Sequence, residues 1–176
     1  MGKILEVIEL GNPILRKVSK KVKSIDSKDV QKLIDDLITT TIHTKGVGLA
    51  APQVSHLLRI FIMYSRPNPR YPKAPLMKHP TEVINPQVHD YSDEIEEGWE
   101  GCLSIPGIRG LVPRHKSIKI SYFDRKKINL TRNYSGFIAR IFQHELDHLN
   151  GIVFLDRIKN TKNIITEKEY LKLFTK

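Results

Sequence analysis

The segment that most constrains the fold lies near the C-terminus, at residues 135–149. Its apolar residues recur at helical spacing and cover two neighbouring faces of a predicted helix. The polar strip of this helix is narrow and consists of Arg140, Gln143, Asp147 and Asn150. A helix with so little polar surface has to be buried on most sides, so the rest of the chain must pack around it.

The same helix carries an HExxH motif, with His144 and His148 four residues apart and Glu145 between them. At this spacing the two Cβ atoms lie about 5–6 Å apart on one face, which allows both imidazoles to bind one metal ion. Glu145 lies about 100° further round, where its carboxylate can reach a water on that metal. Phe137 and Ile141 fall within about 60° of the histidines and extend their face as an apolar wall. The motif predicts a metal-dependent hydrolase whose substrate carries an apolar side chain.

Two histidines leave a tetrahedral metal one protein ligand short when a fourth position stays open for water. Three downstream carboxylates are candidates, and no motif selects among them: Asp156, Glu167 and Glu169. Cys102, the only cysteine, is a better candidate, because a thiolate and two imidazoles form a competent site for Zn²⁺ or Fe²⁺. The alternative for Cys102 is a buried cysteine that serves only as a small apolar side chain.

The remaining pattern favours one α+β domain over residues 1–176. Helices are predicted at residues 12–18 and 27–43, strands at 59–64 and 82–85, an extended hairpin arm at 87–99, and a β-hairpin formed by 117–123 and 127–131. The proline-dense residues 67–80 are predicted to be a loop. We expect short antiparallel and mixed β-sheets packed around the central C-terminal helix that carries HExxH.

Composition limits the location and the partners. Glu6 and Glu9 interrupt any signal-peptide core, no apolar run reaches membrane-spanning length, and one cysteine excludes an intramolecular disulfide, so the cytoplasm is the expected location. A bacterial source fits best, and a mature organellar enzyme would look similar. The net charge of +10, with basic stretches at residues 16–28, 66–78 and 159–176, suggests an anionic partner such as the ribosome. No motif for sequence-specific nucleic-acid binding accompanies the charge.

Three segments together resemble the peptide deformylase family. Residues 46–53, GVGLAAPQ, resemble its GxGLAAxQ motif, residues 100–104 match EGCLS, and residues 143–148 match QHExDH. The motifs follow the order and spacing of the family, and the resemblance covers nearly the whole chain. It implies removal of the formyl group from the N-terminal formylmethionine of nascent polypeptides, with release of formate.

The resemblance also implies the catalytic roles. The ligands of one divalent metal, natively Fe²⁺ in much of the family with Zn²⁺, Ni²⁺ or Co²⁺ as alternatives, would be Cys102, His144 and His148. A water activated by this metal would attack the formyl carbon, with Glu145 as general base and then as general acid. The side-chain amide of Gln53 and the backbone N–H of Leu103 would meet the developing oxyanion.

The substrate-binding residues that the resemblance implies are Gly46, Val47, Gly48, Glu100, Gly101, Arg109, Phe137 and Ile141. Phe137 and Ile141, with Val47 opposite, would form the pocket for the methionine side chain. The peptide backbone would pair with residues 46–48 like an added strand, which explains the glycines there. Arg109 would close the rim of the pocket.

Three further expectations concern the surroundings of the site. Arg114 is expected to pair with Asp147 and to steady the helix. Arg140 occupies a position beside the pocket that is apolar in part of the family, which predicts a more polar outer pocket. Trp99 is expected to pack against the loop at residues 67–80 and to border the site.

Two other functions are compatible with the motifs. A general HExxH protease would use a downstream carboxylate as its third ligand, would leave Cys102 uninvolved and would cleave internal peptide bonds. A catalytically silent basic module would bind ribosomal RNA, would keep the motifs as structure only and would release no formate.

Overall fold

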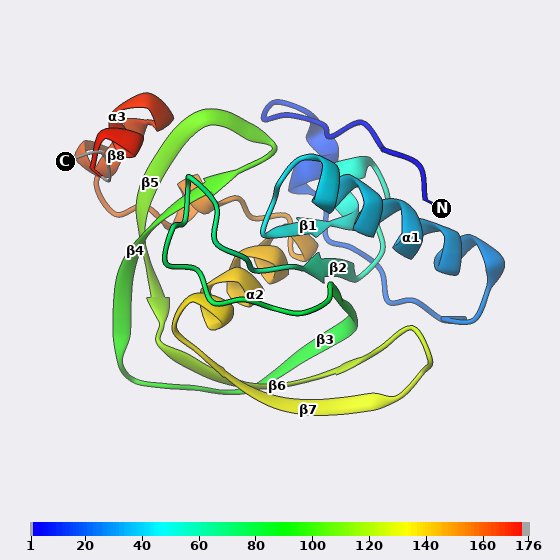
Figure 1. Cartoon of the computed structure of the whole chain (residues 1–176). Coiled ribbons are helices and arrows are strands. Elements are labelled where there is room, and N and C mark those ends of the chain that lie inside the picture. Colours follow the sequence, from blue (N-terminus) through cyan, green and yellow to red (C-terminus); the bar gives the residue numbers. More distant parts are fainter. Residues whose placement is uncertain (1, 174–176) are drawn as a thin grey trace.

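The computed structural model describes residues 2–173 and places helix α2 (Gly136–Leu149) at the centre, between two β-sheets (Figure 1). The larger sheet has the strand order β1 (Gly48–Ala50), β2 (Ile60–Met63), β3 (Thr81–Tyr91), β6 (Ser117–Phe123) and β7 (Asn129–Ser135). The smaller sheet has the order β4 (Ile95–Cys102), β5 (Ile105–His115) and β8 (Ile164–Thr166). The predicted α+β class is confirmed.

All strand ladders within residues 2–173 are antiparallel. The expectation of mixed sheets is therefore wrong, while the expectation of antiparallel ones is confirmed. The short links from β4 to β5 and from β6 to β7 explain two of these pairings, because a parallel pair needs a crossover of a dozen or more residues.

Two helices cover opposite faces of the larger sheet, and alternate side chains of β2 pack against each of them. Helix α1 (Lys28–His43) packs on the face that carries Ile60 and Ile62. Helix α2 packs on the other face, which carries Phe61 and Met63. This alternation is the two-residue period of a strand, and it buries all four side chains of β2.

Local signals set the ends of both helices close to the predicted bounds. The Ser27 side chain caps α1 by accepting a hydrogen bond from the Val30 N–H. Helix α2 follows directly on β7 at Gly136, whose φ is +55°, and the chain leaves it through Gly151, whose φ is +74°. Glycine adopts these left-handed angles at little cost, which makes the start and the end of α2 abrupt.

Several predicted elements differ from the structure. Residues 12–18 form only a 3₁₀ turn, η1 (Pro13–Arg16), and the hairpin arm at residues 87–99 is wrong, because β3 and β4 belong to different sheets. The pattern also did not predict β5, whose prolines and glycines are depleted in strands. Residues 46–53 form β1 and the 3₁₀ turn η2 (Ala51–Val54), and residues 67–80 form a loop as predicted.

After α2 the chain crosses to the smaller sheet. The 3₁₀ turns η3 (Phe154–Arg157) and η4 (Thr161–Asn163) lead to β8, which pairs with β5, and then to the short helix α3 (Glu167–Lys172). The last residues of the basic stretch at 159–176 lie outside the described residues. None of the helices in residues 2–173 has the length and apolar character needed to cross a membrane.

Candidate metal centre

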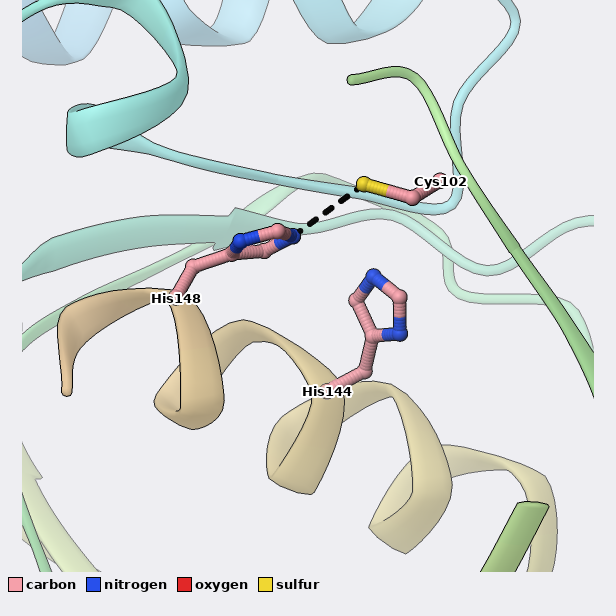
Figure 2. Close-up of side chains that lie close together, drawn as sticks. All are labelled: Cys102, His144 and His148. Atoms are coloured by element: carbon pink, nitrogen blue, oxygen red, sulfur yellow. Dashed lines mark hydrogen bonds between the residues drawn. The ribbon is translucent and has the colours of Figure 1, made fainter. Parts of the chain in front are cut away.

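Cys102, His144 and His148 point toward one another (Figure 2), and their ligand atoms all lie within 4.8 Å of one another. Cys102 Sγ is 3.2 Å from His148 Nε2, and the two imidazole rings are 5.0 Å apart between centroids. A tetrahedral metal with ordinary bond lengths requires ligand atoms about 3.5 Å apart. A thiolate and two imidazoles at this separation form a group that fits a divalent metal of intermediate softness.

A local irregularity at the end of β4 places Cys102 at this point. Strands β4 and β5 pair in regular register up to Glu100, and the register shifts between Glu100 and Cys102. Such a bulge bends the strand and redirects a side chain. Cys102 thus comes from the sheet while the two histidines come from one face of α2.

The three carboxylates considered as alternative ligands are engaged elsewhere. Asp156 forms an ion pair with Arg16, Glu167 lies 2.8 Å from Arg109, and Glu169 lies 2.7 Å from Lys172. Among the described residues, Cys102 with the two histidines is the only group of three such side chains that could hold a metal. The third ligand predicted from the sequence is confirmed.

Glu100 is the centre of a buried network beside the metal group. Its Oε2 accepts a hydrogen bond from His144 Nδ1 at 2.9 Å, so Nε2 is the imidazole atom that would bind a metal. Arg114 binds both carboxylate oxygens at 2.9 and 3.0 Å, and Arg140 binds Oε1 at 2.9 Å. Burial alone raises the pKa of Glu100, but Arg114 and the His144 hydrogen bond outweigh it and hold that pKa well below its usual range.

The predicted pair of Arg114 and Asp147 is confirmed, with Nη1 and Oδ2 2.6 Å apart and both side chains buried. Asp147 also accepts a hydrogen bond from Arg157 at 2.6 Å, which the sequence did not suggest. Arg114 therefore joins Asp147 on α2 to Glu100 on β4. This bridge fixes the helix that carries both histidines relative to the strand that carries the thiolate.

Glu145 carries a deeply buried carboxylate on α2. It is 4% exposed, and its Oε2 has no hydrogen-bond partner among residues 2–173. Burial raises the pKa of Glu145 to about 7. A carboxyl group with this pKa can both accept and return a proton near neutral pH.

The carboxylate of Glu145 lies directly against Gly48 of β1. A Cβ atom at position 48 would be 2.2 Å from Glu145 Oε1, so only glycine leaves room for the carboxylate. The sequence suggested that this glycine admits a peptide backbone. The structure adds a second reason, which depends on a contact between β1 and α2.

Gln53 is held beside the metal group by η2. Its Oε1 accepts a hydrogen bond from the Ala50 N–H at 2.8 Å, which fixes the orientation of the amide. Its Nε2 then points toward Cys102 Sγ at 3.3 Å and Ser104 Oγ at 3.1 Å. The Gln53 amide and the chain at Leu103 therefore border the same cavity as Cys102 and His144.

A cavity of about 190 Å³ connects these groups. The predicted site residues that line it are Gly46, Val47, Gly48, Gln53, Glu100, Gly101, Cys102, Leu103, Arg109, Phe137, Ile141, His144 and Glu145. Lining residues outside the predicted set are Lys45, Arg70, Tyr71, Pro106, Gly107 and Glu167. Of these, Glu167 was considered only as a metal ligand, and Arg70 and Tyr71 only as part of the loop expected beside Trp99. These residues come from segments that are far apart in the sequence, and no local sequence pattern indicates that the segments meet.

Arg140 and Trp99 also line the cavity. Besides Glu100, Arg140 binds the backbone oxygens of Glu96, Gly98 and Val112, and it lies so close to Gly98 that a Cβ there would be 2.7 Å from its Cζ. A guanidinium at this place agrees with the expected polar outer pocket. The ring partner of Trp99 is Tyr170 of α3, with centroids 6.0 Å apart.

Comparison with known proteins gives consistent matches over most of the chain. The family model described as polypeptide deformylase matches residues 4–164. Peptide deformylase 2 of Nostoc sp. is 54% identical over 173 residues, which cover 98% of this chain and 96% of the relative. Peptide deformylase 1 of Bordetella pertussis is 44% identical over 154 residues, which cover 88% and 87%.

A solved structure is similar over the same region. The Met-Ala-Ser-bound class I type b peptide deformylase from Acinetobacter baumannii has a TM-score of 0.86 and 41% identity, and the match covers 90% of this chain and all of that one. The actinonin complex of a peptide deformylase from Synechococcus elongatus has a TM-score of 0.79 and 32% identity, with 96% and 82% coverage.

Proposed function

The chain belongs to the peptide deformylase family of hydrolases, and we propose that it releases formate from the N-terminal formylmethionine of nascent polypeptides. One observation carries the proposal. Two members of the Cys102, His144 and His148 group, Cys102 and His144, line the same cavity as Glu145 and the apolar wall of α2. Glu145 Oε2 has no hydrogen-bond partner among the described residues. This combination suits hydrolysis of an amide next to an apolar side chain.

The ion that Cys102, His144 and His148 would hold supplies the electrophilic part of the chemistry. When bound by Cys102, His144 and His148, a divalent ion polarises a carbonyl and lowers the pKa of water toward neutrality. Fe²⁺ is the proposed native ion, and Zn²⁺, Ni²⁺ and Co²⁺ suit the same mixed sulfur and nitrogen ligands.

Glu145 is the proposed proton carrier. Its Oε2 accepts the proton of the attacking water and returns it to the departing amine. The Nε2 amide of Gln53 and the backbone N–H of Leu103 are the proposed donors to the oxyanion, because the Gln53 amide is held with its donor side toward Cys102. Donors that are oriented before the reaction need no reorganisation when the charge develops.

The edge of the larger sheet is the proposed binding site for the peptide backbone. Strand β1 is an edge strand, and the residues at and before it, Gly46 to Gly48, line the cavity. An extended peptide can add to such an edge through main-chain hydrogen bonds. Phe137, Ile141 and Val47 then surround the first side chain, and Arg109 lies at the far rim.

Formate release is the decisive measurement, and Cys102→Ala separates the metal hydrolase from a general protease. With N-formyl-Met-Ala-Ser and protein kept free of oxygen, we expect formate from the parent chain and no cleavage of internal peptide bonds. Loss of a residue that hydrogen-bonds to a metal ligand typically weakens metal binding roughly 10- to 100-fold. Cys102→Ala removes a ligand itself and should weaken metal binding by more than this. Its formate release should fall in parallel.

The matched controls are Asp156→Asn and Glu169→Gln, which change two of the three rival carboxylates and should keep the metal. Metal content that survives in Cys102→Ala would contradict the ligand assignment. Absence of formate after loading the parent chain with Fe²⁺, Ni²⁺ or Co²⁺ would contradict the proposed substrate.

The basic C-terminal region is the proposed contact with the ribosome, and the named relatives of this chain are bacterial, which supports a bacterial cytoplasm as its location. Lys159, Lys162 and Lys168 are exposed there. Their combined change to glutamine should weaken co-sedimentation with ribosomes, because binding through lysine contacts to phosphate depends on charge. The control is the same change at exposed residues of another region, Lys17, Lys21 and Lys23. Equal loss in both variants would indicate attraction by net charge alone.

A further inference from the structure

An aromatic pair forms one part of the cavity wall. Phe137 precedes His144 by seven residues, which is about 10 Å along the axis of α2. Tyr71, from the loop that precedes β3, packs its ring against Phe137 with centroids 4.9 Å apart, and both residues line the cavity. The wall far from the metal group thus combines a helix residue with a loop residue.

Arg109 of β5 ties Tyr71 to the C-terminal helix. Its Nη1 donates to the Tyr71 hydroxyl at 2.6 Å, while Nε and Nη2 donate to Glu167 Oε2 at 3.2 and 2.8 Å. The Arg109 side chain is only 3% exposed. Hydrogen bonds of a buried charged group are stronger than neutral ones, so this link holds the Tyr71 ring in place.

The position of the guanidinium is itself restricted. A Cβ at Gly101 would lie 2.5 Å from Arg109 Nη1 and 2.6 Å from its Cζ, so the guanidinium rests on the bare backbone of β4. Its Cζ also lies 5.2 Å from the ring centre of Tyr71 and 5.1 Å from that of Tyr170. Arg109 is therefore enclosed by β4, the loop and α3, and it cannot follow Tyr71 if the loop moves.

Two more contacts tie the tip of the loop. The Tyr170 hydroxyl of α3 donates to the backbone oxygen of Arg70 at 2.8 Å. On the other side, Arg70 Nη2 donates to the Lys45 oxygen at 2.7 Å, next to the proposed peptide-binding edge. The loop thus spans from the C-terminal helix to the segment before β1.

We propose that Tyr71 determines specificity by forming the end of the pocket for the first side chain, and that Arg109 and Glu167 are positioning residues that hold Tyr71 there. The proposal rests on the assignment of Phe137 and Ile141 to this pocket. A long unbranched side chain reaches the Tyr71–Phe137 wall and gains contact with it. A short side chain does not reach this wall, so its binding does not depend on whether Tyr71 is held in place.

The test uses metal-loaded Tyr71→Phe and Glu167→Gln with two substrates, N-formyl-Met-Ala-Ser and N-formyl-Ala-Ala-Ser. Tyr71→Phe removes the hydroxyl that Arg109 binds, and Glu167→Gln removes the negative charge opposite Arg109, while both keep the shape of the side chain. KM for the methionine substrate should therefore rise about 3- to 10-fold, and kcat should change less than about twofold. The kcat/KM for the alanine substrate should stay within about twofold. The double variant should be no worse than the poorer single one, because both act through Arg109.

Glu169→Gln on the same helix is the matched control and should leave both substrates unaffected, because Glu169 pairs with Lys172 rather than with Arg109. A rise in KM confined to the methionine substrate supports the positioning role. Unchanged KM in both single variants, or equal losses for the two substrates, would overturn it. Phe137→Ala tests the underlying pocket: if its KM for the methionine substrate is unchanged, the pocket assignment itself fails.

Discussion

Glu145→Ala is expected to lower kcat for N-formyl-Met-Ala-Ser by about 10²- to 10⁴-fold, the usual contribution of a general acid–base group. The metal should stay bound, because Glu145 is not part of the Cys102, His144 and His148 group. Formate release and metal content measured on the same preparation check both statements. Glu145→Asp, which keeps a carboxylate but shortens it, should retain part of the activity. Loss of the metal together with the activity would contradict a purely chemical role for Glu145.

A second variant tests the same carboxylate without removing it. In Gly48→Ala the new methyl group would overlap Glu145 Oε1, so the carboxylate must move. We expect kcat to fall while the metal remains bound. The combined Gly48→Ala and Glu145→Ala variant should be no worse than Glu145→Ala alone, because both changes act on one group. Additive losses would instead indicate that Gly48 acts mainly through the peptide-binding edge.

Glu100→Gln is expected to cost about 3–5 kcal/mol of folding free energy, the range for breaking a buried ion pair from one side. The change keeps the shape of the side chain but leaves Arg140 without a carboxylate and Arg114 with Asp147 alone. A domain of this kind is typically stable by only about 5–15 kcal/mol, so the loss is a large fraction of the total. Urea unfolding of the metal-free variant and parent measures it.

The control for Glu100→Gln lies on the same strand. Glu97 is exposed on β4, and Glu97→Gln should change the free energy of unfolding by less than about 0.5 kcal/mol. Glu100→Gln should also bind metal about 10- to 100-fold more weakly, because Glu100 orients His144. If both glutamine variants unfolded at the same urea concentration, the buried network would contribute no net stability.

Much of the site could be predicted because its parts are local. The period of an α-helix places His144, His148 and Phe137 on one face of α2 whatever the rest of the chain does. Cys102 is 46 residues from His148 in the chain, and only its uniqueness and the family motif singled it out. Strand β5 was missed because its prolines and glycines are typical of loops, and its pairing with β4 and β8 outweighs that preference.

By itself, the sequence determined the helix, the types of metal ligand and the apolar face beside them, since each depends on residues within a few turns of one another. Only the tertiary structure decided that Glu100 is a buried partner of His144 and that Gly48 makes room for Glu145. It also decided that Tyr71 and Glu167 meet Arg109 at the far end of the cavity. The burial and charge balance of such groups depend on which distant segments pack together, and this information is absent from any local pattern of residues.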